Sequence, residues 1–351
     1  MNNNQILPKT IIKWHNYENN RQMPWKEERE PYKIWLSEII LQQTRVNQGK
    51  QYYNNFITKY PTIITLANAN DTEVFKMWEG LGYYNRCKNL LASARYIAYE
   101  LGGLFPTTYK SIFLLKGVGP YTAAAIASFA YNLPHAVVDG NVTRVLARYF
   151  NITTAIDSTE GKKSFALLAQ QLLPIKTPAI YNQAIMDFGS TVCKPKLPLC
   201  PTCVLNKSCQ AYKLHMVNVL PVKQKKIPVK NRYINYIIAT YKNKFYVQQR
   251  LDKDIWQNLW QFIIVENVEE ININTYSKTT AFKKIVGNNA KVKSISKLYH
   301  QKLTHQYIQG YFIQVALSTA LASSNYNLVS KKELQLLAFP RYINSYLASL
   351  T

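Results

Sequence analysis

A carboxylate within an apolar helical pattern is the first group in the chain that could do chemistry. Glu38 lies four residues after Ile34 and three before Leu41, so on an α-helix these side chains share one face. Burial disfavours the charged form of a carboxyl group and raises its pKa. A rise of about two units costs about 2.7 kcal/mol and increases the protonated population at neutral pH about a hundredfold. Glu38 is therefore a candidate general acid; the alternative is a glutamate at the edge of the stripe.

A second carboxylate, Asp139, precedes the helical pattern of residues 142–150. Aspartate at this position accepts hydrogen bonds from the first turn of a helix. Taken alone, Asp139 is better explained as a helix cap than as a catalytic group.

A glycine pair precedes Asp139 by about twenty residues, in Leu115-Lys116-Gly117-Val118-Gly119-Pro120. Two glycines around one apolar residue permit a tight turn between helices. The backbone N–H groups that begin the next helix attract anions, so such a hairpin can hold a DNA phosphate without reading base sequence. A helical hairpin without any ligand explains the glycine pair equally well.

Four of the five cysteines fall within 17 residues, at Cys193, Cys200, Cys203 and Cys209. A disulfide scaffold would spread its cysteines along the chain. Four thiolates in a compact loop favour a metal centre, either a structural zinc ion or a [4Fe–4S] cluster. The fifth, Cys87, lies outside this window, and we expect it to be a packed thiol.

The elements that must position these groups change character along the chain. Residues 1–215 are mostly helical, with short Gly/Pro breaks between segments; the helical patterns cover Ile34–Leu41, Glu73–Trp78, Leu90–Ala98, Tyr121–Ala130 and Val142–Phe150. A linker with two prolines and three lysines follows at residues 220–228. Beyond it, β-branched and aromatic residues predict strands at Tyr233–Tyr241, Lys244–Gln249, Gln261–Val265 and Tyr307–Val315.

The formal net charge of the 351 residues is +24, and both parts of the chain contribute. Lys and Arg exceed Asp and Glu by 11 in residues 1–222 and by 13 in residues 223–351. A basic surface on folded domains favours nucleic acid as the partner. A composition rich in Lys, Asn, Ile and Tyr, as AT-rich genomes encode, is the other explanation. No apolar run approaches the roughly 20 residues of a membrane span, and the polar first residues lack a signal-peptide core. We expect a cytoplasmic protein, nucleoid-associated in a bacterium.

Together these motifs resemble the helix-hairpin-helix DNA glycosylase superfamily, to which endonuclease III belongs. Within it the chain is most similar to the adenine DNA glycosylases of base-excision repair, which remove adenine mispaired with 8-oxoguanine or guanine. The resemblance covers about Trp14 to Pro221 and continues more weakly beyond. The motifs that carry it are Trp35-Leu36-Ser37-Glu38, Leu41-Gln42-Gln43-Thr44, Gly80-Leu81-Gly82-Tyr83-Tyr84, Leu115–Thr122 and Val138–Val145.

The resemblance implies a mostly α catalytic part followed by an α+β Nudix-like domain. Residues 29–135 would form a six-helix barrel with the helix-hairpin-helix, and residues 1–28 with 136–215 the iron–sulfur helical module. Residues 216–230 would be the linker, and residues 231–351 the Nudix-like lesion-recognition domain. The Glu-rich catalytic box of Nudix hydrolases is missing from the sequence, and Gln261 stands where the family usually has Glu.

The same resemblance implies a mechanism. Glu38 would protonate adenine at N7, and Asp139, left ionised, would stabilise the positive charge that develops on the sugar. Asn141 and Tyr121 match positions that orient Glu38 and the water network. Relatives that cleave the strand carry a lysine where this chain has Tyr121, so we expect a monofunctional hydrolase.

Contacts with DNA and with the extruded base are implied in the same way. Gln43 and Tyr83 would fill the vacated stack, beside Thr44, Leu81 and Gly82, while Gly117, Val118 and Gly119 would hold a phosphate. Trp25, Val46, Gln183 and Met186 fall where the family lines its adenine pocket. Lys26 departs from the Arg or Gln of many relatives.

The spacing Cys193-x6-Cys200-x2-Cys203-x5-Cys209 is that of the iron–sulfur module in endonuclease III-like glycosylases, which implies one [4Fe–4S] cluster. The cluster would hold the loop that carries Lys194, Lys196 and Lys207 against DNA phosphates. In the C-terminal part, Leu303-Thr304-His305 stands where the family usually has a Phe-Ser-His hairpin that meets the oxidised guanine; an ordinary strand turn is the alternative.

The expected partner is double-stranded DNA that contains an adenine opposite 8-oxoguanine or guanine, bound by a monomer away from membranes. Two other functions fit the same scaffold. An endonuclease III-type enzyme for oxidised pyrimidines is disfavoured by Tyr121 and by the extra basic domain. A DNA-binding protein without activity is disfavoured because binding alone needs neither Glu38 nor Asp139.

Overall fold

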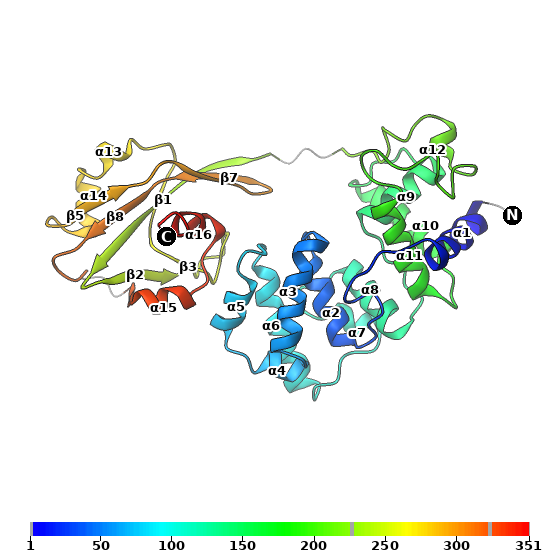
Figure 1. Ribbon diagram of the computed structural model, residues 1–351, viewed down its shortest axis with the longest axis horizontal. Helices are drawn as coiled ribbons and strands as arrows, with labels where there is room; N and C mark the ends of the chain where they lie inside the picture. The colour runs from blue at the N-terminus through cyan, green and yellow to red at the C-terminus, as the bar shows by residue number, and fades with distance from the viewer. Residues whose placement is uncertain (1–2, 225–227, 322–324, 351) are drawn as a thin grey trace. The chain divides into compact units, whose positions relative to one another are not determined.

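The computed structural model describes residues 3–224, 228–321 and 325–350. The chain divides into two compact units (Figure 1). The first contains residues 1–68 and 89–225, and the second contains residues 69–88 and 226–351. The sequence does not predict that residues 69–88 belong with the C-terminal part.

The first unit is helical. Its elements are α1 (Asn3–Tyr17), α2 (Pro31–Leu41), α3 (Val46–Lys59), α4 (Ile63–Ala67), a π-helix η1 (Tyr96–Glu100), α7 (Tyr109–Phe113), α8 (Pro120–Tyr131), α9 (Gly140–Phe150), α10 (Thr159–Leu172), α11 (Pro178–Thr191) and α12 (Gln210–Lys213). Helix α6 (Asn85–Arg95) begins in the second unit and ends in the first.

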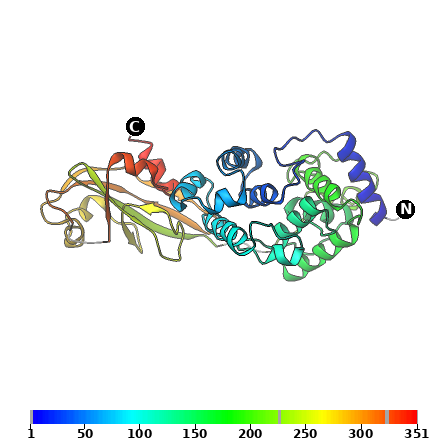
Figure 2. The same ribbon diagram turned by 90° about the horizontal axis from the view of Figure 1, so that it is seen from below.

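Two groups of helices flank the candidate site. Helices α1, α9, α10 and α11 lie together (Figure 2) and share one apolar core. In this core Trp14 and Phe188 are in edge-to-face contact at 5.0 Å. Helix α2 packs against α3 and α8. It begins at a cap, where the Glu30 carboxylate accepts from the N–H groups of Tyr32 and Lys33, and nearly all of its residues are buried.

The predicted helices are all present, with one difference. The pattern over Leu90–Ala98 predicts one continuous helix, but the α-helical hydrogen bonding of α6 ends at Arg95 and continues as the π-helix. Apolar periodicity does not distinguish these two hydrogen-bonding patterns. No helix among the described residues is long and apolar enough to cross a membrane.

The second unit is built on a mixed sheet. Its strands are β1 (Lys230–Tyr241), β2 (Lys244–Gln249), β3 (Trp260–Gln261), β4 (Ile263–Asn267), β5 (Lys291–Ile295), β6 (Tyr299–Lys302), β7 (Gln306–Gly310), β8 (Phe312–Ala316) and β9 (Asn327–Val329). Its helices are α5 (Asp71–Trp78), α13 (Ile273–Tyr276), α14 (Thr280–Val286), α15 (Lys331–Leu336) and α16 (Arg341–Leu347). Strand β1 pairs with β2 and β4 antiparallel and with β7 and β8 parallel.

Two predicted strands are each broken in two. The pattern over Gln261–Val265 predicts one strand, but β3 ends at Gln261 and β4 begins at Ile263. The pattern over Tyr307–Val315 predicts one strand, but β7 ends at Gly310 and β8 begins at Phe312. Between them the Tyr311 N–H donates to the Asn235 side chain, so β1 changes partners at this point. Gly310 permits the close approach, because a Cβ there would lie 2.1 Å from the Ile234 carbonyl oxygen.

Candidate active site

A cavity of about 530 Å³ opens in the helical unit. Its walls come from α1 and the loop after it, from α2, from the start of α8, from the cap of α9 and from α11. The candidate catalytic side chains and the candidate adenine-pocket side chains all line this one cavity: Glu38, Tyr121, Asp139, Asn141, Trp25, Val46, Gln183 and Met186.

Glu38 is buried on α2, as its apolar stripe predicts, with 6% of its surface exposed. Burial raises the pKa of Glu38 to about 7, and the nearby Asp139 carboxylate adds to the rise. The side chain of Tyr121 donates a hydrogen bond to Glu38, which lowers the pKa and partly opposes these effects. A carboxyl group with a pKa near 7 is about half protonated at neutral pH, so it can give and take a proton there.

Asp139 caps α9 with one carboxylate oxygen. Its Oδ1 accepts from the N–H of Asn141 at 2.8 Å and from the N–H of Val142 at 2.7 Å, while Oδ2 accepts from Asn141 Nδ2 at 2.6 Å. Burial raises the pKa of Asp139 above its ordinary value, and these hydrogen bonds together with the Arg144 charge offset only part of that rise. Asp139 is therefore both a helix cap and a wall of the cavity, so the two interpretations of this residue are compatible.

The cap is tied to the helix behind it. Arg144 Nη2 donates to Asn141 Oδ1 at 2.8 Å and to the Gly189 carbonyl oxygen at 2.6 Å, and Arg144 Nε donates to the Cys193 carbonyl oxygen at 2.8 Å. This arginine fixes Asn141, which in turn holds the Asp139 carboxylate. The orientation of the carboxylate is thus set by a chain of hydrogen bonds.

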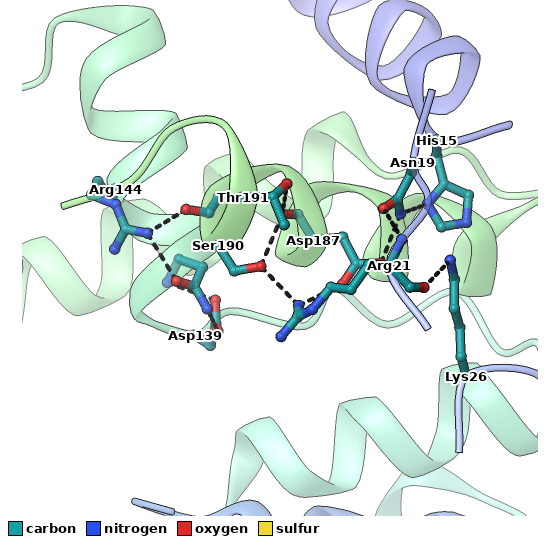
Figure 3. Close-up of polar contacts among 11 residues, drawn as sticks. His15, Asn19, Arg21, Lys26, Asp139, Arg144, Asp187, Ser190 and Thr191 are labelled. Atoms are coloured by element: carbon teal, nitrogen blue, oxygen red, sulfur yellow. Dashed lines mark hydrogen bonds and ion pairs between the residues drawn. The ribbon is translucent and has the colours of Figure 1, made fainter. Parts of the chain in front are cut away.

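The sequence does not predict a polar network that joins α11 to the end of α1 and the loop after it (Figure 3). Asp187 is fully buried on α11, and Arg21 Nη1 reaches its carboxylate at 2.7 Å. Arg21 also donates to Ser190 Oγ at 2.7 Å, while Asn19 Nδ2 contacts both Asp187 Oδ2 and His15 Nδ1 at 2.9 Å. Burial lowers the pKa of His15, which favours the neutral form of its ring. The one sequence signal is an aspartate directly before the buried Phe188.

The candidate adenine-pocket residues form another part of the cavity wall. Trp25 is 9% exposed and packs edge-to-face on Tyr53 at 5.3 Å. Gln183 and Met186 face the cavity from α11 and are partly buried. Lys26 also lines the cavity, and its Nζ donates to the Arg21 carbonyl oxygen at 2.8 Å (Figure 3).

The predicted hairpin is present between α7 and α8. Gly117 has φ of +80°, a conformation that favours glycine, and Val118 is 8% exposed. Helix α8 has Gly119 as its N-cap and no side-chain cap hydrogen bond, so no capping side chain occupies the N–H groups of its first turn. Gln42 Nε2 donates a hydrogen bond to the Gly117 carbonyl oxygen at 3.3 Å and so holds the hairpin. The sequence alone predicts no role for this side chain.

Gln43 and Thr44 follow directly after α2. Gln43 is exposed with φ of +56°, and Thr44 lines the cavity. The remaining stack-filling candidates lie in the second unit. There Leu81 is buried, Gly82 has φ of +74°, and Tyr83 is 47% exposed with φ of +49°.

The four clustered cysteines line one small pocket beside α9 and α11. Burial raises the pKa of the Cys203 thiol to about 11, and the other three thiols add to this rise. Arg148 Nη1 lies 3.5 Å from Cys193 Sγ, and the Leu205 N–H donates to Cys203 Sγ at 3.4 Å. Over the described residues, no three His, Cys, Asp or Glu side chains are arranged to hold a single metal ion. Cys87 is fully buried elsewhere, as a packed thiol should be.

The candidate lesion-reading residues form the turn between β6 and β7. The Leu303 N–H donates to the Gln306 carbonyl oxygen at 2.7 Å, which closes the hairpin. Thr304 and His305 are exposed. Thr304 Oγ1 lies 2.7 Å from the hydroxyl of Tyr83 in the same unit, so two candidate DNA-contacting residues meet directly.

Comparisons with known proteins agree with this site. A family model described as HhH-GPD superfamily base excision DNA repair protein matches residues 36–171. The chain is 32% identical over 302 residues to the adenine DNA glycosylase of Buchnera aphidicola subsp. Schizaphis graminum, an alignment that covers 86% of this chain and 84% of that protein. It is 33% identical over 334 residues to the adenine DNA glycosylase of Buchnera aphidicola subsp. Baizongia pistaciae, an alignment that covers 92% of this chain and 91% of that protein.

The chain belongs to the adenine DNA glycosylase family. The human member is 42% identical over 211 residues, which cover 58% of this chain and 38% of the human protein. A solved thermostable thymine-DNA glycosylase is similar with a TM-score of 0.56 and 31% identity, over 60% of this chain and 97% of that one. The endonuclease III of a solved DNA complex matches with a TM-score of 0.53 and 21% identity, over 62% of this chain and 99% of that one. This likeness shows the shared fold alone.

The predicted family and the helical glycosylase fold are thus confirmed, with a mixed-sheet part at the C-terminus. The family consists of base-excision DNA repair enzymes that hydrolyse N-glycosyl bonds, and DNA is the partner.

Proposed function

We propose that this protein removes adenine mispaired with 8-oxoguanine or guanine from double-stranded DNA, acting as a monomer. The observation that carries the proposal is that two carboxyl groups in different environments, Glu38 and Asp139, line one cavity. Burial raises the pKa of both groups. For Glu38 it does so to about 7, so this group holds a proton near neutral pH, whereas at Asp139 three accepted hydrogen bonds and Arg144 oppose the rise and favour the ionised form. Hydrolysis of a glycosidic bond requires an acid that protonates the leaving group and an anion that stabilises the positive charge on the sugar.

The reaction begins when the adenine nucleotide leaves the helical stack, at a cost of a few kcal/mol. Phosphate contacts at Gly117, Val118 and Gly119 and stack filling by Gln43 and Tyr83 offset that cost. The exposure of Gln43 and Tyr83 and the uncapped start of α8 support these roles.

Glu38 then donates its proton to N7 of adenine, and the electron pair of the glycosidic bond moves onto the departing base. Positive charge develops on the sugar, and Asp139 stabilises it from the cap of α9. Water adds to the sugar carbon and loses a proton, which leaves an abasic site in an intact strand. Tyr121 holds the Glu38 carboxyl through its hydrogen bond, and Asn141 holds that of Asp139.

The cavity walls support the choice of base. Trp25 offers an aromatic surface, and Gln183 offers an amide that can both donate to and accept from the edge of adenine. Val46 and Met186 complete the apolar lining.

The four cysteines would hold one [4Fe–4S] cluster. They share a pocket, an N–H group donates to one sulfur and a guanidinium group lies near another, which are contacts that stabilise thiolates. The cluster would be structural, because Arg144 and Arg148 bind the backbone at Cys193 and Lys194. Lys194, Lys196 and Lys207 would face phosphates.

The C-terminal sheet would be a Nudix-like lesion reader with Leu303, Thr304 and His305 at its contact point. Thr304 presents a hydroxyl that can meet the altered N7/O8 edge of oxidised guanine. Its exposure and its contact with Tyr83 support this role. The six-helix barrel and the iron–sulfur module remain the proposed division of the helical part, with the boundaries that the sequence predicts.

One assay tests the proposal. A duplex with adenine opposite 8-oxoguanine is incubated with the protein, and cleavage is scored with and without alkali. We expect abasic product that becomes a nick only after alkali, and no measurable product with Glu38→Gln, while the exposed control Glu160→Gln behaves like the wild type.

Three outcomes would contradict the proposal in different ways. Nicking without alkali would indicate a lyase, and activity on oxidised pyrimidines alone would favour the endonuclease III-type alternative. Binding without any base release would indicate a protein that only binds DNA.

A further inference from the structure

The segment that links α5 to α6 is bonded to the C-terminal part at two separate points. At its end, Tyr83 meets Thr304 in the β6–β7 turn. At its beginning, α5 reaches the stretch Leu337-Ala338-Phe339 through two side chains that the proposed function does not use, Lys76 and Glu79. All of these residues belong to the second unit.

Glu79 and Lys76 satisfy backbone groups of that buried stretch. Glu79 Oε1 accepts from the Phe339 N–H at 2.8 Å, and Lys76 Nζ donates to the Leu337 carbonyl oxygen at 3.0 Å. Lys76 and Glu79 also form an ion pair at 2.9 Å across one turn of α5. Phe339 is 1% exposed, so losing the acceptor for its N–H would leave a buried donor without that bond.

The same stretch is fixed on its other side by the sheet. The Trp260 N–H donates to the Ala338 carbonyl oxygen at 2.9 Å, and the Phe339 ring stacks on Phe262 at 5.5 Å. Bonds to α5 and to β3 therefore alternate along three consecutive residues. We call the contacts of Lys76 and Glu79 with Leu337 and Phe339 the α5 clamp.

A rigid turn connects the α5 clamp with Tyr83. Trp78 Nε1 donates to the Gly82 carbonyl oxygen at 3.2 Å, and Arg86 Nη2 donates to the same oxygen at 3.1 Å. The Arg86 guanidinium lies over the rings of Trp78 and Tyr83, at 5.1 and 5.8 Å. A shift of α5 is thus passed on to Tyr83, since these contacts leave the turn little freedom.

We infer that Glu79 is a positioning residue for lesion recognition: the α5 clamp sets the place of Tyr83 against Thr304, and so the selectivity for oxidised guanine opposite adenine. This inference rests on the proposed function, because it needs Thr304 to meet the lesion. Glu79 touches neither base nor sugar in this scheme. It acts by holding the turn that carries Tyr83 in a fixed position relative to the β6–β7 hairpin that carries Thr304.

The test measures lesion preference, defined as the ratio of dissociation constants for a non-cleavable adenine analogue opposite guanine and opposite 8-oxoguanine. Glu79→Ala should lower this ratio about three- to tenfold, the effect of one hydrogen bond. Glu79→Gln keeps an oxygen acceptor for the Phe339 N–H and should retain most of the preference. The matched control Glu269→Ala removes an exposed carboxylate of the same unit and should change nothing.

Two readouts separate positioning from a general loss of structure. In a Thr304→Val background, Glu79→Ala should change the preference by less than about twofold, because the contact between Tyr83 and Thr304 that the clamp sets is already lost. Single-turnover excision of adenine should fall less opposite guanine than opposite 8-oxoguanine in Glu79→Ala, because Thr304 is proposed to meet only the oxidised base. If Glu79→Ala does not fold, Lys76→Met tests the other half of the α5 clamp and should lower the preference by a smaller factor.

Undiminished preference in Glu79→Ala, or in Lys76→Met where that variant is used, would overturn the inference, as would full additivity with Thr304→Val. A wild-type protein that excises adenine but shows no preference for oxidised guanine would instead overturn the proposed lesion reader and this inference with it.

Discussion

Glu38→Gln should stabilise the protein at alkaline pH while it abolishes base release. The pKa of Glu38 is about 7 in the folded protein and about 4.5 in the unfolded chain, so the folded state holds the proton more tightly. Stability linked to this group is fully present below about pH 4.5 and is lost as the pH rises through about 7. Glutamine is neutral at every pH and does not suffer this loss.

The magnitude follows from the shift. A difference of about 2.5 units, at about 1.36 kcal/mol per unit, corresponds to about 3 kcal/mol in the free energy of unfolding above the folded-state pKa. The gain of Glu38→Gln over the wild type should therefore be small at about pH 4.5 and approach about 3 kcal/mol at about pH 8. Glu38 would be a case of activity maintained at the expense of stability.

The assay is urea unfolding of wild type and Glu38→Gln across that pH range, followed by tryptophan fluorescence. Trp35 lies on the same helix and is fully buried, so it reports on this part of the fold. Glu160→Gln, at an exposed position, should show no pH-dependent gain. A difference between Glu38→Gln and wild type that stays constant from acid to alkaline pH would refute the reasoning that burial raises the pKa of Glu38.

Further predictions concern the neighbours of this group, the cysteines and the sheet. Tyr121→Phe removes a hydrogen bond that lowers the pKa of Glu38, so the alkaline limb of the excision rate should move up by about one pH unit; an unmoved or lowered limb would contradict this. Asp139→Asn keeps a capping side chain but loses the charge, so single-turnover excision should fall about 10²- to 10³-fold with little change in melting temperature. Cys203→Ser should lose bound iron, measured by metal analysis, and weaken DNA binding; full iron content would argue against Cys203 as a ligand. Gly310→Ala should destabilise the second unit by about 1–3 kcal/mol in urea unfolding, since its Cβ would collide with the Ile234 carbonyl oxygen, and an unchanged midpoint would show that the strands can separate.

The features that the sequence predicts well are local ones. The apolar stripe around Glu38 predicts its burial, since helical periodicity alone places Ile34 and Leu41 on the same face. The glycine pair predicts the turn before α8, and the position of Asp139 before an apolar pattern predicts the cap of α9. Each of these depends on residues within about one or two helical turns.

The features that it misses depend on residues far apart in the chain. The buried ion pair joins Arg21 to Asp187 across 166 positions, and neither residue type at either position indicates the other. The break after Gly310 depends on the side chain of Asn235, which replaces a strand partner. The α5 clamp likewise joins Glu79 to the backbone of Phe339, and a backbone group leaves no signature in a sequence.

The account rests on Glu38 as the proton donor to adenine, and the pH dependence of single-turnover excision tests it most directly. With a duplex that carries adenine opposite 8-oxoguanine, the wild-type rate should fall as the pH rises through about 7, and Glu38→Gln should leave no measurable rate at any pH. A wild-type rate that stays level across that range, or a Glu38→Gln protein that still releases adenine, would contradict it.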